Sequence, residues 1–192
     1  MKWLSRICIL AGCFLLAYFG YSLYDSINSN KATLEEVKAA LEVQKESVIE
    51  DELFDIEEYQ AKAGEGFGIL TIPKLDRSIG IVEGADEDAL KKGVGHVEST
   101  VFPGQNEQIV LSGHRDGVFR DFGELKKGDI FLVEMPYGEY QYEIRDYRIV
   151  DQYDTSIIGQ MGEEVLVIST CYPFNYIGLA PERFVFFAYP ID

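Results

Sequence analysis

The stretch from 165 to 174 reads VLVISTCYPF, four apolar residues followed by a polar pair, a cysteine and a proline-containing turn. A short apolar run that is rich in β-branched residues and bounded by a turn signal is typical of a buried strand. The chain has the same texture from Gly66 onward, and the predicted strands span 68–72, 78–82, 108–112, 130–136, 139–150, 165–171 and 183–189. Several short strands at close spacing favour a single all-β barrel or sandwich, with helical patterns only at 86–91 and near 119–125.

Composition narrows the class of protein and of partner. The chain has 192 residues, which is room for one ordinary domain with accessory segments. Its formal charge of −16 argues against a nucleic-acid partner, because phosphate binding needs clustered Lys and Arg, and it disfavours lying flat on anionic lipid. Half of that charge falls between Asp25 and Gly66, where twelve acids face four lysines.

The N-terminus predicts a membrane anchor. The uncharged, mostly apolar run from Ile7 to Tyr24 is just long enough to cross a bilayer core, which needs about 17 or more such residues. A cleaved signal peptide fits less well because 17–20 is a poor cleavage site, and the lipoprotein-like box at 10–13 has too few apolar residues before it. Lys2 and Arg6 precede the run, so the N-terminus is expected in the cytoplasm and the rest of the chain outside.

Residues 25–65 form an acidic connector between this anchor and the first strand. Thr33 and Glu36 make a capping-box signature, and apolar residues at helical spacing predict a helix over 32–50 that can continue to Ala61. A stalk that holds the domain off the membrane and a solvated helix docked loosely on the domain by its apolar stripe are both compatible with this pattern. Two heptads are too short to predict a coiled coil.

Three polar residues stand at the edges of very hydrophobic strands, a placement that suits a preorganised site. Cys171 ends one strand, His114 follows another after Gly113, and Arg183 opens the last. Cys8 and Cys13 lie in the anchor, so Cys171 is a lone exported thiol and a candidate reactive group, although a buried inert cysteine is the more ordinary state.

The combination of Cys171, His114 and Arg183 suits thioester chemistry. Such chemistry needs a thiolate, a group that shuttles a proton near neutral pH, and a donor for the developing oxyanion. A nearby Arg183 would also favour the thiolate of Cys171. Twelve positions separate these two residues, so antiparallel neighbouring strands joined by the loop 172–182 could bring them together.

The ordered motifs Gly113-His114, Thr170-Cys171 and Arg183 resemble the signature of the sortase family. The segments 169–174, 176–178 and 180–184 are most similar to class D, and the resemblance covers the exported domain and the anchor. The chain has no Asp-Pro pair, which argues against a lidded, pilin-polymerising class C enzyme, and it lacks room for the extra helices of class B. The resemblance implies a closed eight-stranded barrel over 66–192, preceded by an anchor over 1–24 and a stalk over 25–65.

The same resemblance implies transpeptidation of surface proteins that carry a Leu-Pro-x-Thr-Gly or Leu-Pro-x-Thr-Ala sorting signal. Cys171 would attack the carbonyl after Thr and form a thioacyl intermediate, while His114 protonates the departing amine and then deprotonates the incoming one. Arg183 would hold the substrate carbonyl or the oxyanion. The partners expected are the sorting-signal peptide, an amine on a cell-wall precursor and the cell membrane through residues 7–24.

Other polar residues have weaker assignments. Thr170 and His96 are candidate substrate contacts, with strand packing for Thr170 and a structural role for His96 as the alternatives. Asp116 could orient His114, although turn capping is the simpler role. No cofactor is expected and no zinc-ligand spacing occurs, while Asp151 and Asp154 leave a weak calcium dependence open.

Two rival classes of function fit the sequence less well. Papain-like proteases place the cysteine before the histidine, and caspases require Gln-Ala-Cys-x-Gly around the nucleophile, whereas 169–173 reads STCYP. A non-enzymatic rival is a catalytically inactive anchored adhesin or peptide-binding module. The retention of cysteine, histidine and arginine together argues against that rival.

Overall fold

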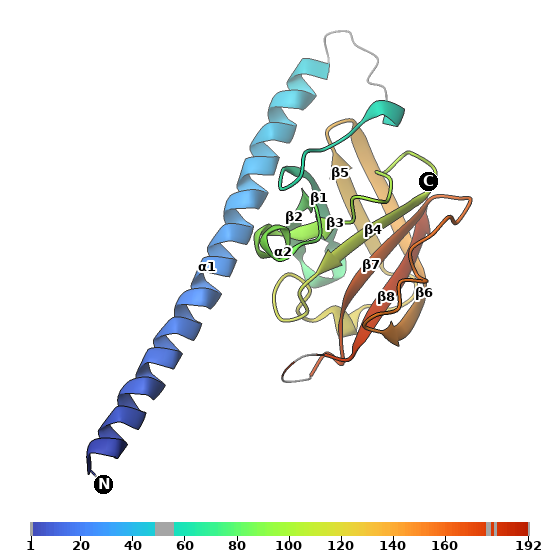
Figure 1. Cartoon of the computed structure of the whole chain (residues 1–192). Helices are drawn as coiled ribbons and strands as arrows, with labels where there is room; N and C mark the ends of the chain where they lie inside the picture. Colours follow the sequence, from blue (N-terminus) through green and yellow to red (C-terminus); the bar gives the residue numbers. More distant parts are fainter. Residues whose placement is uncertain (1, 49–55, 176–177, 179, 192) are drawn as a thin grey trace.

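The computed structural model describes residues 2–48, 56–175, 178 and 180–191. A long helix, α1 (Lys2–Val48), leads into a barrel with one short helix, α2 (Glu87–Lys92), at its side (Figure 1). The strands are β1 (Gly66–Ile72), β2 (Arg77–Glu83), β3 (Val94–His96), β4 (Gln108–Gly113), β5 (Ile130–Met135), β6 (Gly138–Asp151), β7 (Val165–Tyr172) and β8 (Glu182–Pro190). Single 3-10 turns cover Ile56–Glu58, Pro73–Leu75 and Phe122–Glu124.

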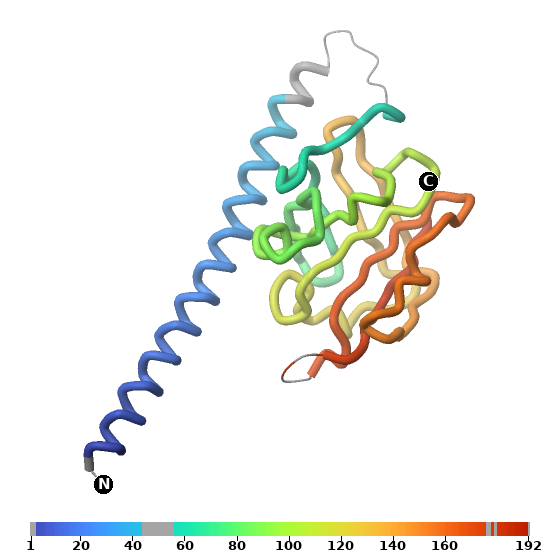
Figure 2. The backbone as a smooth tube through the Cα atoms, viewed as in Figure 1, coloured from blue at the N-terminus to red at the C-terminus, as the bar shows by residue number. Residues whose placement is uncertain are grey.

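The eight strands of the described chain close into a barrel in the order β1-β2-β3-β4-β7-β8-β6-β5. The pairs β2–β3 and β4–β7 are parallel, and the other pairs are antiparallel. The closed eight-stranded barrel expected from the sequence is confirmed, and the alternative of an open sandwich is wrong. The backbone trace in Figure 2 shows β4, β7 and β8 lying side by side on one wall of the barrel.

The wall around β7 is buried on both faces, which explains why the run VLVIS shows no alternation of apolar and polar residues. Leu166 and Ile168 point into the main core of the barrel. Val165 and Val167 belong to a second buried cluster on the outer face. Odd-numbered residues of β7 therefore face outward and even-numbered residues face inward, because successive strand residues alternate between faces.

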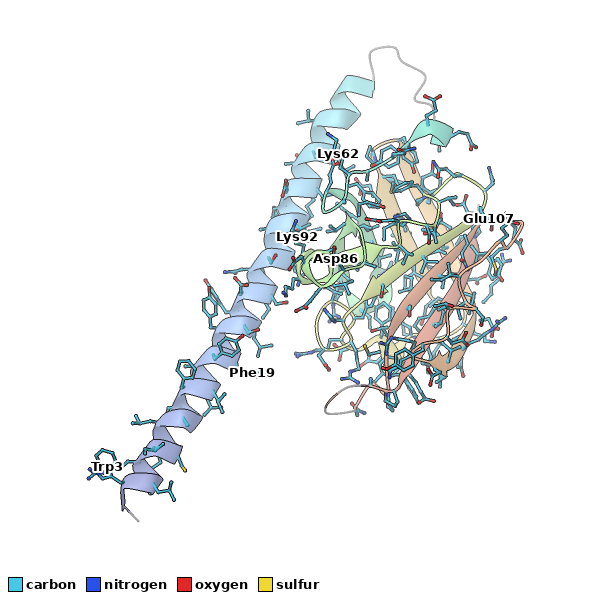
Figure 3. All side chains as sticks on the ribbon, in the orientation of Figure 1. Trp3, Phe19, Lys62, Asp86, Lys92 and Glu107 are labelled. Atoms are coloured by element: carbon cyan, nitrogen blue, oxygen red, sulfur yellow. The ribbon has the colours of Figure 1, made fainter. Side chains whose placement is uncertain are left out.

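Helix α1 is longer than the sequence predicted, running as one helix from Lys2 to Val48 without a break at the predicted anchor boundary of residue 24. It does not continue to Ala61, because 56–58 form a 3-10 turn and an irregular segment follows. Residue 50, the predicted helix end, lies outside the described residues. By length and composition α1 is the one described helix that could cross a membrane. Figure 3 shows the labelled side chains of Trp3 and Phe19 on the N-terminal half of α1, which extends past the barrel.

The C-terminal half of α1 is docked on the barrel. Val37 and Leu41 are almost fully buried and form a small apolar cluster with Ile69 of β1. Gly66 and Gly80 make the close approach possible, since a Cβ at either position would stand against side chains of α1. The apolar stripe predicted for the connector is thus a tight packing surface.

Seven strands lie within two residues of their predicted bounds, but β3 was not predicted. Gly93 and Gly95 surround Val94 there, and a Cβ on either glycine would collide with the backbone of β2 or the residues after it. The predicted helix at 86–91 is confirmed as α2, whose first turn is capped by the side chain of Asp86.

Candidate functional site

Cys171 and Arg183 are direct partners across the antiparallel pair β7–β8. Direct cross-strand partners point to the same face with Cβ atoms about 4.5–5.5 Å apart. For this pair the face is the outer one, and both side chains are half-buried. The structure therefore brings together the predicted nucleophile and the predicted oxyanion donor, twelve residues apart in sequence.

His114 reaches the same place from the other side of β7. Strand β4 runs parallel to β7 with Gly113 opposite Thr170, so His114 follows β4 at the level of Cys171. Neighbouring strands lie about 4.8 Å apart. His114, exposed to solvent, therefore lies with Cys171 and Arg183 in a row across the ends of β4, β7 and β8. These three strands lie side by side in Figure 1.

Thr170 stabilises the base of this row. Its side chain points inward, is 2% exposed, and donates a hydrogen bond of 2.9 Å from Oγ1 to the carbonyl oxygen of Gly113. The hydroxyl thereby ties the last residue of β4 to the residue before Cys171. Of its two predicted roles, strand packing is the one the structure supports, because the hydroxyl faces away from the outer surface where Cys171 lies.

Arg115 is a residue of the site that the sequence did not single out. The residue is 7% exposed, and Nη1 donates a hydrogen bond of 2.6 Å to the carbonyl oxygen of Pro173, two residues after Cys171. Nε and Nη2 donate to the two carboxylate oxygens of Asp116 at 3.1 and 2.9 Å. Arg115 therefore joins the turn that carries His114 to the turn that follows Cys171.

The charges around Arg115 are mutually favourable. The hydrogen bond to Asp116 raises the pKa of Arg115 above its ordinary value, and negative charge on Cys171 contributes a smaller effect in the same direction. The same hydrogen bond holds the pKa of Asp116 below its usual range. Asp116 thus pairs with Arg115, and the predicted alternatives of orienting His114 or capping the turn are not the contacts its carboxylate makes.

The guanidinium of Arg183 lies at the base of the segment that joins β7 and β8. Its Nη1 donates to the carbonyl oxygens of Ala180 and Glu182, at 3.3 and 3.0 Å. Both acceptors are ordinary backbone groups, so a substrate oxyanion could replace either of them at little cost to the fold. Arg183 is therefore placed to act as a donor beside Cys171.

His96 lies apart from this row, in the interior of the barrel. It is 1% exposed, its Nδ1 lies 2.7 Å from Oε2 of Glu83, and its Nε2 donates to the carbonyl oxygen of Val101 at 3.0 Å. Its ring also stacks on Phe102 at 4.5 Å between centroids. This burial argues against the predicted substrate contact of His96 at the rim and favours its structural role.

Aromatic rings follow the cysteine in the chain, and a hollow opens beside them. The rings of Tyr172, Phe174 and Phe184 contact one another with centroids 5.1–5.6 Å apart. Phe174 and Phe184 pack against the main core, so this group of rings lies at the end of the barrel, on the face of β7 and β8 opposite to Cys171 and Arg183. A mostly charged hollow of about 500 Å³ is lined by Arg115, Asp116, Arg120, Asp121, Gly123, Glu124, Phe174 and Asn175. The half-buried rings can contact an apolar peptide at this end of the barrel.

Metal binding finds no support among the described residues, where no three side chains of His, Cys, Asp or Glu converge. Asp151 and Asp154 instead accept backbone amides of their own turns, from Tyr153 and Ser156, each at 2.9 Å. These carboxylates therefore stabilise the connection between β6 and β7.

Comparison with known proteins agrees with this geometry. Residues 70–191 match the family model described as the Sortase domain. Sortase D of Bacillus subtilis (strain 168) is 44% identical over 191 residues, which cover 97% of this chain and 96% of that relative.

Solved structures show the same relationship. The Clostridium perfringens Sortase D5 transpeptidase is similar with a TM-score of 0.70 and 28% identity, covering 86% of this chain and 99% of that one. The catalytic domain of B. anthracis SrtD has a TM-score of 0.60 and 40% identity, covering 74% of this chain and 97% of that one. The chain therefore belongs to the sortase family of cysteine transpeptidases and is most like the members of class D.

Proposed function

We propose that this enzyme cleaves a Leu-Pro-x-Thr-Gly or Leu-Pro-x-Thr-Ala sorting signal after Thr and transfers the surface protein to an amine of a cell-wall precursor. The observation that carries the proposal is the placement of His114, Cys171 and Arg183 at the ends of three adjacent strands, with Cys171 and Arg183 as direct cross-strand partners. These side chains supply a proton shuttle, a nucleophile and an oxyanion donor at neighbouring positions.

The reaction proceeds in two balanced steps. The thiolate of Cys171 attacks the Thr carbonyl carbon, the C–N bond to the next residue breaks, and protonated His114 gives its proton to the departing amine. An acceptor amine then attacks the thioester, loses its proton to His114 and releases the thiolate. Arg183 stabilises the oxyanion in both steps. The thiol, imidazole and guanidinium complete this chemistry without a cofactor.

The chemistry of the side chains also supports an assignment of the substrate contacts and of the membrane topology. The half-buried rings of Tyr172, Phe174 and Phe184 suit the Leu-Pro part of the signal, because aromatic side chains bury apolar groups well. We assign residues 7–24 to a single membrane span, residues 25–65 to the connector and residues 66–192 to the catalytic domain. Lys2 and Arg6 favour a cytoplasmic N-terminus, which places the catalytic domain outside the cell.

The test uses the full chain in detergent with Leu-Pro-x-Thr-Gly and Leu-Pro-x-Thr-Ala peptides and a soluble amine. A Thr–amine product that disappears in Cys171→Ala and falls sharply in His114→Ala and Arg183→Ala is the expected result. EDTA should leave the rate unchanged, since Asp151 and Asp154 hold their own turns. Product formation that persists in Cys171→Ala refutes the nucleophile, and absence of reaction across the panel favours a peptide-binding module.

A further inference from the structure

A groove of about 340 Å³ lies between α1 and the barrel, beside the turn that carries His114. Its helical wall runs from Leu23 to Leu34, and its barrel wall is formed by Arg77–Ile79 of β2 and by residues 116–120. The N-terminal half of α1 continues past the barrel at the end where β7 finishes and β8 begins (Figure 1). The groove is therefore open toward the predicted membrane span.

The width of the groove is fixed by the way α1 is seated. Thr33 is buried at the upper end, and its methyl group would stand 3.0 Å from a Cβ at Gly80. Val37 and Leu41 continue the same contact along the helix. Because this seat is closely packed, the segment from Leu23 to Leu34 cannot close onto the barrel without loss of those contacts.

The groove stands at the level of lipid headgroups if residues 7–24 span the membrane, so this inference rests on the anchoring in the proposed function. The polar layer on each side of a bilayer core is about 5–8 Å thick. An α-helix rises 1.5 Å per residue, so Lys31 stands about 10 Å beyond Tyr24. Leu23 then lies at the boundary with the acyl chains and Ile27 about 4.5 Å beyond Tyr24 within the headgroup layer. The backbone of Lys31 lies about 2–5 Å outside this layer, so its side chain can reach back to the headgroups.

The lining of the groove changes from apolar at the membrane end to basic at the end away from the membrane. Leu23 and Ile27 are 44% and 55% exposed at the membrane end. Of the four charged residues that line it, three are basic (Lys31, Arg77 and Arg120), in a chain with 17 basic and 33 acidic residues. The groove is thus a local basic site on an acidic protein, and anionic lipid is repelled elsewhere on its surface.

Two of its polar groups lack a complete set of partners. The ammonium of Lys31 has no partner among the residues that the structure describes, whereas Arg77 donates to the backbone of the 116–120 turn and to Asp121. Oδ1 of Asn30 is the one buried side-chain oxygen or nitrogen without a hydrogen bond in the described chain, although its Nδ2 donates to Ser26. A buried acceptor of this kind calls for a donor, which a hydroxyl supplies.

We propose that this groove binds one anionic phospholipid of the outer leaflet whose headgroup carries a hydroxyl, such as phosphatidylglycerol. The acyl chain lies along Leu23 and Ile27, the phosphate pairs with Lys31 and Arg120, and a headgroup hydroxyl donates to Asn30. The bound lipid contacts the turn after His114 and fixes the height of the reactive row above the membrane.

The experiment places the full chain in nanodiscs that contain a photoactivatable phosphatidylglycerol, and mass spectrometry maps the labelled residues. Labelling is expected at 23–34 and 116–120, and unlabelled phosphatidylglycerol should compete for it better than phosphatidylcholine. Lys31→Gln should weaken labelling about five-fold, the effect of one basic residue close to an anionic surface. Ser26→Trp, which fills the groove, should abolish it.

Matched controls lie on the same helix. Asn28→Trp adds the same bulk on a face of α1 outside the groove, and Lys38→Gln removes an exposed charge further along the helix. Neither should change the labelling. Thermal unfolding of each variant confirms that the barrel is folded, and Lys31→Gln keeps the test decisive if Ser26→Trp unfolds.

Two results would overturn the proposal. One is equal labelling by phosphatidylglycerol and phosphatidylcholine probes, and the other is labelling that neither Lys31→Gln nor Ser26→Trp reduces. Either result would mean that the probe labels only the boundary lipid that surrounds any membrane helix. Peptide transfer by the full chain in detergent tests the proposed reaction separately, because it needs no lipid; a chain that fails to enter nanodiscs overturns the anchor and this proposal together.

Discussion

Replacing Arg115 by methionine should loosen the link between the two turns that carry the reactive groups. Methionine keeps most of the aliphatic bulk and removes the charge and all five N–H donors. The carbonyl oxygen of Pro173 then loses its hydrogen bond of 2.6 Å, and Asp116 loses both of its bonds to the guanidinium. Because the side chain is 7% exposed, water cannot fully replace these donors.

The size of the effect follows from the burial of each contact. A hydrogen bond to a charged group contributes about 1.5–3 kcal/mol when it is buried, which applies to Pro173. The pair with Asp116 contributes about 0–1 kcal/mol, since the side chain of Asp116 is 77% exposed. We expect Arg115→Met to lower the free energy of unfolding by about 2 kcal/mol. If the same energy serves positioning in the transition state, kcat/KM falls about 30-fold.

A change in thiol reactivity separates positioning from plain destabilisation. The positive charge of Arg115 lies close enough to Cys171 for the two to interact. Removing that charge takes away an attraction for the attacking sulfur, so alkylation of Cys171 by iodoacetamide should become slower in Arg115→Met. Arg115→Lys keeps the charge but not the fork of donors, so its alkylation rate should stay near that of the unaltered enzyme while kcat/KM still falls.

The assays are peptide transfer kinetics, alkylation rates and urea unfolding on the same preparations. Arg145→Met is the matched control, because Arg145 is an exposed arginine of β6 that contacts Glu143 at 3.8 Å and the ring of Tyr189 at 5.0 Å. It should leave transfer and alkylation unchanged and lower the free energy of unfolding by no more than about 1 kcal/mol. Unaltered kcat/KM and an unaltered alkylation rate in a folded Arg115→Met enzyme would refute the reasoning.

Three further predictions concern contacts that support the site. Thr170→Val removes the hydroxyl that donates to the carbonyl oxygen of Gly113, so we expect a loss of about 1–3 kcal/mol in the free energy of unfolding. Tm should then fall by about 2–4 °C for each kcal/mol lost, and Thr170→Ser should restore most of it. An unchanged Tm in Thr170→Val would show that this hydrogen bond does not stabilise the fold. Tyr142→Phe removes a bond of 2.6 Å to Glu164 and should cost about 1.5–3 kcal/mol in urea unfolding, with an unchanged midpoint as the contrary result. Gly80→Val should lift α1 and speed hydrogen exchange at 33–41 without altering alkylation of Cys171; slow exchange there would show that the seat tolerates a side chain.

The sequence was informative wherever a strand buries a continuous apolar face. The run before Cys171 predicted β7, and the run before His114 predicted β4, because β-branched residues bounded by turn signals have few other stable placements. Strand β3 escaped prediction for the opposite reason. It has three residues, and Gly95 sits in it because the backbone after β2 approaches too closely for a side chain. Such a requirement is set by tertiary contact and leaves no periodic signal.

The candidate site likewise has parts that the sequence predicts and parts that only the fold brings together. Cys171 and Arg183 could be paired from sequence because twelve residues suit two antiparallel strands joined by a loop. The parallel pairing of β4 with β7 spans 57 residues between Gly113 and Thr170, and no local spacing encodes it. Arg115 was overlooked because an arginine after a histidine in a turn is ordinarily a solvated residue. Its burial depends on Pro173, which only the fold brings near.

Two cross-links above and below Cys171 explain how a site built on strand ends can be precise. Below it, the hydroxyl of Thr170 fixes the end of β4 to β7 inside the barrel. Above it, Arg115 fixes the turn after His114 to the carbonyl of Pro173 on the outer side. Either bond alone would allow the two turns to pivot about it. The parallel ladder of β4 and β7 sets the separation of the two strands, and these two bonds extend that link to the turns that follow them. The positions of His114 and Cys171 are therefore held by the scaffold before substrate binds.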